Sequence, residues 1–504
     1  MFRFGYQVET YRFGKRALGL YFVLAVVALG YCGAAGPASA SLERELTLAE
    51  CIALAVRNNR DLAAGRLDRL AQKLSLQDAE DEFRPSPSFG MSLNHNSTGA
   101  ELGGRSESSN IGVSPRVTLR MPTGGNFSLS APNTVQISED GDEQYRQNVE
   151  ISFKQPLLRG GGTQVGTAGI VAARRAEQLG VLGFKSAVMG LVTQTILAYR
   201  NVIRSKRAVE IAKRSVQRAR ELLEVNRILI DTGRMAKQDI VQTEANIAER
   251  ELGLTEAEGS LNDARLALID ILDIDSRTWI RPTEPLRMEA ARHNADRSVM
   301  LALKNRTDYL SALLGIESAK TALAVANNAR KWGLDLDLTA SFGHRGRSLS
   351  EAYGRFDDTY GVGLSVDIPL GANLGARQRN YEKARIALRR SHLRLAELRQ
   401  SIDVEVRAAV RDVEVQRRRA ELAKRARELT ERKLEIERIK LHAGLTTNFR
   451  VVRFEDDLVR SQNNEIGAVI AYLNALTALD RTQGTTLDTW RIEIDSPVDE
   501  GENK

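Results

Sequence analysis

The side chains that most often carry out chemistry occur in this sequence, but their spacing does not assemble a catalytic site. The histidines have neither the paired spacing of metal ligands nor a serine-histidine-aspartate arrangement; they are His95, His293, His344, His392 and His442. The glycine-rich stretch RGGGTQVG (159–166) lacks the Gly-Lys-Ser/Thr ending of a phosphate loop and fits a strand-to-helix joint. Carboxylates are abundant, but solvated helix faces explain them. We therefore expect no enzyme, no metal site and no cofactor.

The composition favours long helices over compact domains. Of the 504 residues, 27% are charged and 5% are aromatic, and no proline occurs in 157–281 or 370–496. Stretches of this kind are typical of extended helices. From Ala376 to Ala443 neither glycine nor proline occurs, which at about 1.5 Å per residue gives a rod roughly 100 Å long. Apolar residues recur there every seven residues and predict a coiled-coil seam; the clearest are Leu388, Leu395, Ile402, Val406, Val413, Leu434 and Leu441.

The N-terminus has the features of a secretory signal. Basic residues precede an apolar run from Ala17 to Gly30, and Ala38-Ser39-Ala40 matches a cleavage site, so 1–40 is predicted to be a signal peptide. Cys32 could instead be a lipidation site, although Tyr31 before it is bulkier than the usual small residue. Cleavage after Ala40 leaves Cys51 as the only cysteine, which excludes an intramolecular disulfide. The signal removes much of the net charge of +7, so a nucleic-acid partner is not expected.

After the signal no segment has the ~18 or more consecutive apolar residues of a membrane helix. Alternating apolar and polar residues instead predict strands. Period-two alternation of apolar and polar residues occurs around 89–94, 149–154, 334–342 and 360–367. It fits a barrel with lipid outside and water inside, and it also fits a soluble sandwich. The segments 113–121 and 126–132 flank a tight turn and predict an extra hairpin. If the hairpin joins the sheet, the chain supplies six strands instead of four.

The sequence reads as two copies of one plan. CIALAVRNNRDL (51–62) aligns with SVMLALKNRTDY (298–309) at a constant offset, which predicts a tandem structural repeat. The first copy, 41–280, is expected to hold a first helix, strands within 86–158, a long helix 163–230, a tip 231–236 and a helix 237–273. The second, 281–496, is expected to hold a helix 295–330, strands 334–343 and 360–369, a long helix 376–443, a tip 443–447 and a helix 448–480. A disordered tail is expected over 497–504.

This plan resembles the TolC-like outer-membrane efflux proteins over essentially the whole mature chain. The resemblance is carried by LTLAECIALAVRNNRDL (46–62), by QPLLRGGG (155–162) with its counterpart IPLGANLG (368–375), and by the two tips. The family commonly has proline in the asparagine-rich stretch, where this chain has Arg60 and Thr307. The resemblance implies an α+β membrane protein, a homotrimeric transmembrane β-barrel continuous with a long, coiled-coil packed periplasmic α-helical barrel. Family members give four strands each to a barrel of twelve, and six strands per chain is our hypothesis here.

The function that the resemblance implies is an exit channel in the outer membrane of a Gram-negative cell, extending into the periplasm. It would be the outer component of a tripartite efflux or export system, surrounded by outer-membrane lipid. It would passively conduct substrates delivered by an inner-membrane transporter and a periplasmic adaptor, or membrane fusion protein. The alternatives are the outer-membrane component of type I protein secretion and a periplasmic coiled-coil scaffold without a pore.

The resemblance also implies that the tips bind the adaptor. Family tips resemble G-x-x-[ST]-x-x-D, and the first tip fits with Gly233, Ala236 and Asp239. The second fits with Gly444 and Thr447, but Arg450 stands where Asp239 stands in the first. The expected adaptor-binding residues are Gly233, Arg234, Ala236, Asp239, Gly444, Leu445 and Thr447. The alternative is a plain helix-helix turn, in which glycine takes a left-handed conformation and a short polar side chain caps the next helix.

A pore constriction is expected beside the second tip, where the family carries acidic rings. This chain has Arg450 and Arg453 there, with Asp457 one turn beyond. Spacings of three and seven residues place the three on one helix face. We expect a basic constriction that either pairs with Glu455, Asp456 or Asp457, or favours anions. The alternative is that the arginines face outward.

Overall fold

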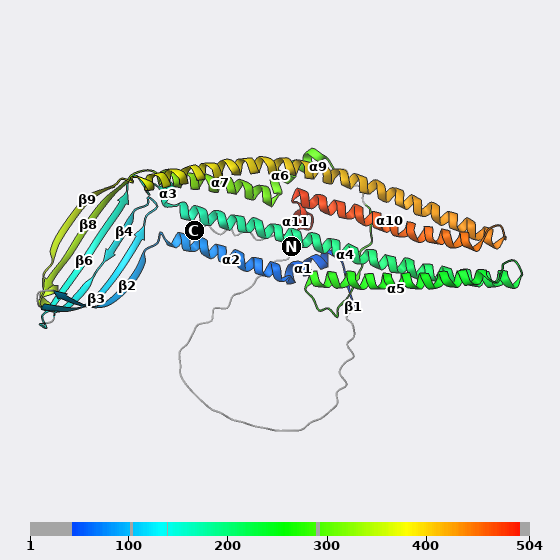
Figure 1. Ribbon diagram of the computed structural model, residues 1–504, viewed down its shortest axis with the longest axis horizontal. Coiled ribbons are helices and arrows are strands. Elements are labelled where there is room, and N and C mark those ends of the chain that lie inside the picture. Colours follow the sequence, from blue (N-terminus) through cyan, green and yellow to red (C-terminus); the bar gives the residue numbers. More distant parts are fainter. Residues whose placement is uncertain (1–42, 101–103, 139, 289–292, 494–504) are drawn as a thin grey trace, which may run out of the picture. The chain divides into compact units, whose positions relative to one another are not determined.

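A computed structural model of the protein describes residues 43–100, 104–138, 140–288 and 293–493 (Figure 1). The expected signal peptide (1–40), Cys32 and the expected tail (497–504) lie outside the described residues.

The longer helices occur in the same order in the two halves of the chain. The first half contains α1 (Leu48–Asn58), α2 (Arg60–Asp81), α3 (Thr163–Gly166), α4 (Ala168–Asp231) and α5 (Asp239–Leu272). The second contains α6 (Ala295–Asn305), α7 (Thr307–Asn328), α8 (Leu349–Gly354), α9 (Ala372–His442), α10 (Asn448–Gln483) and α11 (Thr486–Thr489). Helices α6 and α7 begin 247 residues after α1 and α2, and β8 begins the same distance after β2. The shared offset extends the sequence match from 12 residues to a whole helix-helix-strand unit.

The helix expected over 295–330 is two helices, and the first half has the same break. Arg306 ends α6 with φ −65° and ψ 124°, and Asn59 ends α1 with φ −59° and ψ 125°. The Asn59 carboxamide oxygen accepts a hydrogen bond from the backbone N–H of Leu62 at 3.1 Å, which starts α2. Arg60 and Thr307 are therefore first residues of new helices, where proline is well tolerated because its missing N–H has no partner there. This explains why the family can place proline at these positions.

The strands form one antiparallel sheet with six positions. The strands are β2 (Ser86–Ala100), β3 (Gly104–Arg120), β4 (Asn126–Ser130), β5 (Asn133–Ser138), β6 (Glu143–Pro156), β8 (Gly333–Gly346) and β9 (Asp357–Asp367). Their order is β2-β3-β4-β6-β8-β9, and β5 continues the line of β4 between β3 and β6. The extra hairpin lies inside the sheet, because Pro115 pairs with Phe89 and Leu129 pairs with Ile151. These ladders give the chain the six strand positions that we hypothesised.

A second, small sheet joins the two halves. Strand β1 (Glu43–Leu46) pairs in parallel with β7 (Trp279–Pro282), which lies between the halves. Tyr199 of α4 donates a hydrogen bond to the carbonyl of Leu46 at 2.9 Å and so ties this pair to the helices. The alternation analysis did not predict these strands, since four residues are too few to show a period.

The helical core lies around the middle of α4. Helix α4 is the one described helix that is long and apolar enough, by length and composition alone, to cross a membrane. Its most apolar residues are packed against α1, α5 and β7, and Val192, Ile196 and Tyr199 are fully buried. Gly180 lies where a Cβ would meet the side-chain amide of Gln72 of α2, so a larger residue there would displace that amide. The core accounts for part of the apolar character of α4, since 39% of its most apolar window is buried.

The long helices lie side by side in a defined order. Near the tips, α5 packs on α4, α4 on α10 and α10 on α9. Nearer the sheet, α2 packs on α4, α4 on α7 and α7 on α9. The seam predicted along α9 is on its packed side, where Ile402, Val406, Val413, Leu434 and Leu441 are buried. The lateral edges of this layer are therefore α2 and α5 on one side and α9 on the other (Figure 1).

Candidate functional site

The two tips have the same backbone turn. Gly233 and Gly444 have φ of 71° and 75°, a region that favours glycine because it has no Cβ. At the first tip, the N–H of Gly233 donates to Ile230 O and that of Arg234 to Leu229 O, at 2.9 and 2.8 Å. The N–H groups of Gly444 and Leu445 make the equivalent bonds to Leu441 and Lys440, both at 2.9 Å. Both long helices therefore end in a Schellman motif, which satisfies their last carbonyl groups.

All the residues expected at the tips lie on the surface or near it. Arg234, Ala236 and Thr447 are exposed, and Asp239 is half-buried at the start of α5. Thr447 precedes α10, but its hydroxyl makes no capping hydrogen bond, so the expected polar cap is absent there. Leu445 is 77% exposed, and Phe449 beside it is 58% exposed. We did not predict Phe449, although an aromatic residue beside a turn glycine in a chain with few aromatics was a usable signal.

A buried carboxylate distinguishes the second tip from the first. Glu437 of α9 is only 5% exposed, and the Thr446 hydroxyl donates a hydrogen bond to its Oε1 at 2.5 Å. Lys440 Nζ lies 3.6 Å and Arg450 Nη1 4.0 Å from its carboxylate oxygens. The Thr446 hydrogen bond, followed by the nearby cations, lowers the pKa of Glu437. Arg450 is therefore loosely tied to α9 while most of its side chain remains in solvent.

The structure does not pair the expected constriction residues with the neighbouring acids of α10. Glu455 receives hydrogen bonds from Arg218 of α4 and Arg438 of α9, and Asp456 is bonded to Arg250 of α5. Asp457 forms an ion pair with Arg460 at 2.6 Å. Within the described chain Glu455 and Asp456 are thus paired with arginines of α4, α5 and α9, and Asp457 is paired with an arginine one turn along α10. The expected pairing of Arg450 or Arg453 with Glu455, Asp456 or Asp457 is therefore not present within the described chain.

The face predicted for Arg450, Arg453 and Asp457 is present on α10. Arg450 and Arg453 are exposed and Asp457 is half-buried, whereas Val451, Glu455 and Leu458 face the protein interior. The three residues thus share the solvent side of α10 next to the second tip. Their charges are available to solvent or to another copy of the chain.

A buried polar cluster links three helices just above the tips. Asn226 of α4 donates hydrogen bonds to Thr243 of α5 at 2.8 Å and to Asn448 of α10 at 3.0 Å. Asn448 donates to the same threonine hydroxyl at 3.0 Å, and all three side chains are buried. Such a cluster specifies which helices meet, since any other partner would leave these groups unpaired. In the sequence these residues appear only as single polar residues among apolar ones, so their contact could not be predicted.

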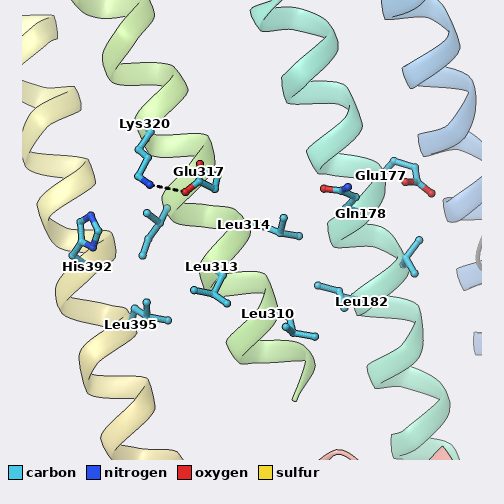
Figure 2. A pocket seen from close by; sticks show the side chains of 12 residues that line it. Glu177, Gln178, Leu182, Leu310, Leu313, Leu314, Glu317, Lys320, His392 and Leu395 are labelled. Carbon is cyan, nitrogen blue, oxygen red and sulfur yellow. Dashed lines mark hydrogen bonds and ion pairs between the residues drawn. The ribbon is translucent and has the colours of Figure 1, made fainter. Parts of the chain in front are cut away.

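An apolar pocket of about 650 Å³ lies between α4, α7 and α9, away from the tips. Figure 2 shows Leu310 and Leu314 of α7 pointing toward α4, from which Leu182 points back. Its polar rim includes the Glu317–Lys320 ion pair at 2.7 Å. The described residues include no cluster of three or more histidine, cysteine, aspartate or glutamate side chains that could hold a metal ion. Most of the lining is apolar, and its titratable side chains are Glu177, Glu317, Lys320 and His392.

The second half of the chain carries a family signature. Residues 299–485 match the outer membrane efflux protein family, and they include α7, β8, β9, α9 and α10. Over this range the chain is similar to the outer membrane efflux proteins. The match supports an outer-membrane location with a helical part in the periplasm, as in the channels of this family. The family consists of channels and not of enzymes.

Solved structures of outer-membrane channels share the fold of this chain over most of its length. The outer membrane channel CmeC of Campylobacter jejuni has a TM-score of 0.68 at 15% identity, covering 87% of this chain and 86% of its own. VceC of Vibrio cholerae has a TM-score of 0.66 at 16% identity, with coverage of 87% and 96%. The open state of the Neisseria gonorrhoeae MtrE outer membrane channel has a TM-score of 0.64 at 16% identity, with coverage of 87% and 89%. No curated protein sequence matches the chain.

Proposed function

We propose that three copies of this chain form the exit channel of a tripartite efflux or export system. The observation that carries the proposal is that the sheet and the helical layer each have two lateral edges without a neighbouring strand or helix. Strands β2 and β9 each have one neighbour in the sheet, and α5 and α9 are the edges of the helical layer. Copies placed side by side close both layers at once, which removes the unpaired strand edges. A ring of three chains gives eighteen strands and a helical tube that continues them.

The exposed side chains of the edge strands support a membrane-embedded barrel. Phe89, Met91 and Leu93 of β2 are 67–75% exposed, and Val362 and Leu364 of β9 are similarly open. Apolar side chains that alternate with polar ones and so share one face of a sheet suit contact with lipid. The helices then extend into the periplasm, because they leave the opposite end of the barrel from the loops. The constant 247-residue offset between the halves supports an origin by tandem duplication.

In this assembly the channel is passive, and the inner-membrane transporter supplies energy. The tips around Gly233 and Gly444 contact a periplasmic adaptor through Arg234, Ala236, Asp239, Leu445 and Thr447, with exposed Leu445 and Phe449 as apolar contacts. Arg450, Arg453 and Asp457 of the three copies surround the opening as a constriction. The positive charges of Arg450 and Arg453, repeated in three copies, favour passage of anions.

The proposal is tested by mass measurement and conductance of the purified full chain. In detergent, light scattering should give the mass of three chains, and the protein should conduct ions after insertion into planar bilayers. A deletion strain should become more sensitive to exported toxic compounds, and the wild-type gene should restore resistance. A monomer that extracts without detergent and conducts nothing would favour the scaffold.

A further inference from the structure

The exposed edge of α9 carries a basic row with a regular period. Arg411, Arg418, Arg425 and Arg432 recur every seven residues, and all four are exposed. Within the described residues no ion pair or hydrogen bond involves their side chains. An apolar stripe runs beside them and is also exposed; it consists of Val415, Leu422, Leu429 and Ile436. Apolar residues flanked by charges at a seven-residue period are typical of a coiled-coil interface that lacks its partner helix.

The exposed edge of α5 carries the complementary acidic row. Glu249, Glu256, Asp263 and Asp270 also recur every seven residues, and all are exposed without an ion pair in the described chain. The other acidic row of α5 is already used, because Glu251 pairs with Arg220 and Glu258 with Lys213 of α4. Small and apolar residues lie beside the free row; they include Ala248, Leu252, Gly259 and Leu266. One edge of the chain is thus acidic and the other basic.

The contacts of α10 fix the relative heights of these two edges. Asn448 of α10 meets Thr243 of α5, and Glu455 of α10 meets Arg438 of α9. Helix α10 runs parallel to α5 and antiparallel to α9, so equal residue counts from these contacts reach equal heights. Glu256 lies thirteen residues beyond Thr243, and the same count beyond Asn448 reaches Ser461, six residues past Glu455. Six residues from Arg438 along α9 is Arg432, which therefore lies at the height of Glu256.

The same counting aligns the other charges and the apolar stripe. Asp263 lies at the height of Arg425, and Asp270 at that of Arg418. In the stripe, Leu252 lies at the height of Ile436 and Leu266 at that of Leu422, whereas Gly259 lies at that of Leu429. In the middle of the stripe, Leu429 of one copy thus faces Gly259 of the next. Rotation about an axis parallel to the helices preserves height, so the alignment applies between neighbouring copies.

We propose that the acidic row of α5 docks on the basic row of α9 in a second copy of this chain, with Glu256 at Arg432, Asp263 at Arg425 and Asp270 at Arg418. The proposal rests on the three-fold assembly proposed above and adds its register and charge pattern. Because every interface has one acidic and one basic side, the ring can form only head to tail. Two identical edges would repel each other, so a symmetric pair of chains is disfavoured.

The register is tested by disulfide cross-linking of the full-length protein in native membranes. The variant Glu256→Cys/Arg432→Cys should give covalent dimers and trimers on oxidation. Glu256→Cys/Arg425→Cys is the matched control, one rung or about 10 Å out of register, and should not cross-link. Cys51 is buried and should not take part.

The charge pattern is tested by reversal on each side. Glu256→Lys/Asp263→Lys alone and Arg425→Glu/Arg432→Glu alone should each lower the temperature at which the trimer dissociates by several degrees, and combining all four should restore it. The residues are exposed, so the fold of each chain should persist. A conducting trimer that is insensitive to both reversals and cross-links only in the control register would overturn the proposal and leave the channel function standing. A wild-type monomer without conductance would overturn the three-fold assembly itself.

Discussion

The two tips share one backbone but not one chemistry. Gly233 and Gly444 end their helices with the same pair of hydrogen bonds, so both helices reverse direction in the same way. The first tip then continues with Asp239, which forms no ion pair within the described chain. The second continues with Arg450, placed near the buried carboxylate of Glu437. The difference teaches that the turn is set by local backbone requirements, whereas the charges around it can differ between the tips.

The largest expected difference concerns the ion pairs behind the tips. Glu455 holds Arg218 and Arg438 and is 5% exposed, so Glu455→Ala leaves two partly buried cations unpaired. We expect a loss of about 3 kcal/mol in the free energy of unfolding. Glu251→Ala in α5 removes an exposed ion pair with Arg220 of α4 and should lower the free energy of unfolding by less than about 1 kcal/mol. Thermal unfolding in detergent measures both, and equal losses would contradict the proposed difference.

The backbone equivalence of the tips predicts equal costs for equal substitutions. Gly233→Ala and Gly444→Ala each force a side chain into the left-handed region and should each destabilise the protein by about 1 kcal/mol. Gly183→Ala is the control, because this glycine lies within α4 with open space at its Cβ position and should be neutral or slightly stabilising. A loss at only one tip would show that the two turns are not equivalent.

The charge difference predicts a change in ion selectivity that is confined to the second tip. Arg450→Glu/Arg453→Glu should shift the channel toward cations by a few-fold, if both side chains line the opening. Arg234→Glu at the first tip is the control and should change selectivity less. Reversal potentials in planar bilayers under a salt gradient provide the measurement. Unchanged selectivity in the double variant would place these arginines outside the conducting path.

The smallest expected effect is a pH response of the second tip. The pKa of Glu437 is lowered in the folded protein. Its ionised form therefore stabilises the tip at pH values above the ordinary glutamate pKa of about 4.3. That contribution is lost as pH falls through the lowered pKa. A spin label at Leu445→Cys should therefore become more mobile in acid, while one at Arg234→Cys should change less. Glu437→Gln should remove the difference between neutral and acidic pH, and a persistent response would assign it to another group.

Local regularities allowed much of the helical framework to be predicted. The seam of α9 lies where Val406 and Val413 indicated, since a seven-residue period is visible without knowledge of any partner. The extra hairpin was visible because its turn is only a few residues long. The break at Arg306 was missed, because extended backbone at one residue leaves no mark in an apolar period. The short strands β1 and β7 were missed because they stabilise each other across more than 200 residues.

The candidate site divides in the same way between local and distant causes. The sequence by itself determined the two turns, because a positive φ requires glycine at Gly233 and Gly444 whatever surrounds them. It also determined the common face of Arg450, Arg453 and Asp457, which follows from helix geometry. Only the tertiary structure decided which charges meet. Glu455 takes its arginines from α4 and α9, and Asn226 joins Thr243 and Asn448, because packing brings together residues that no sequence spacing relates.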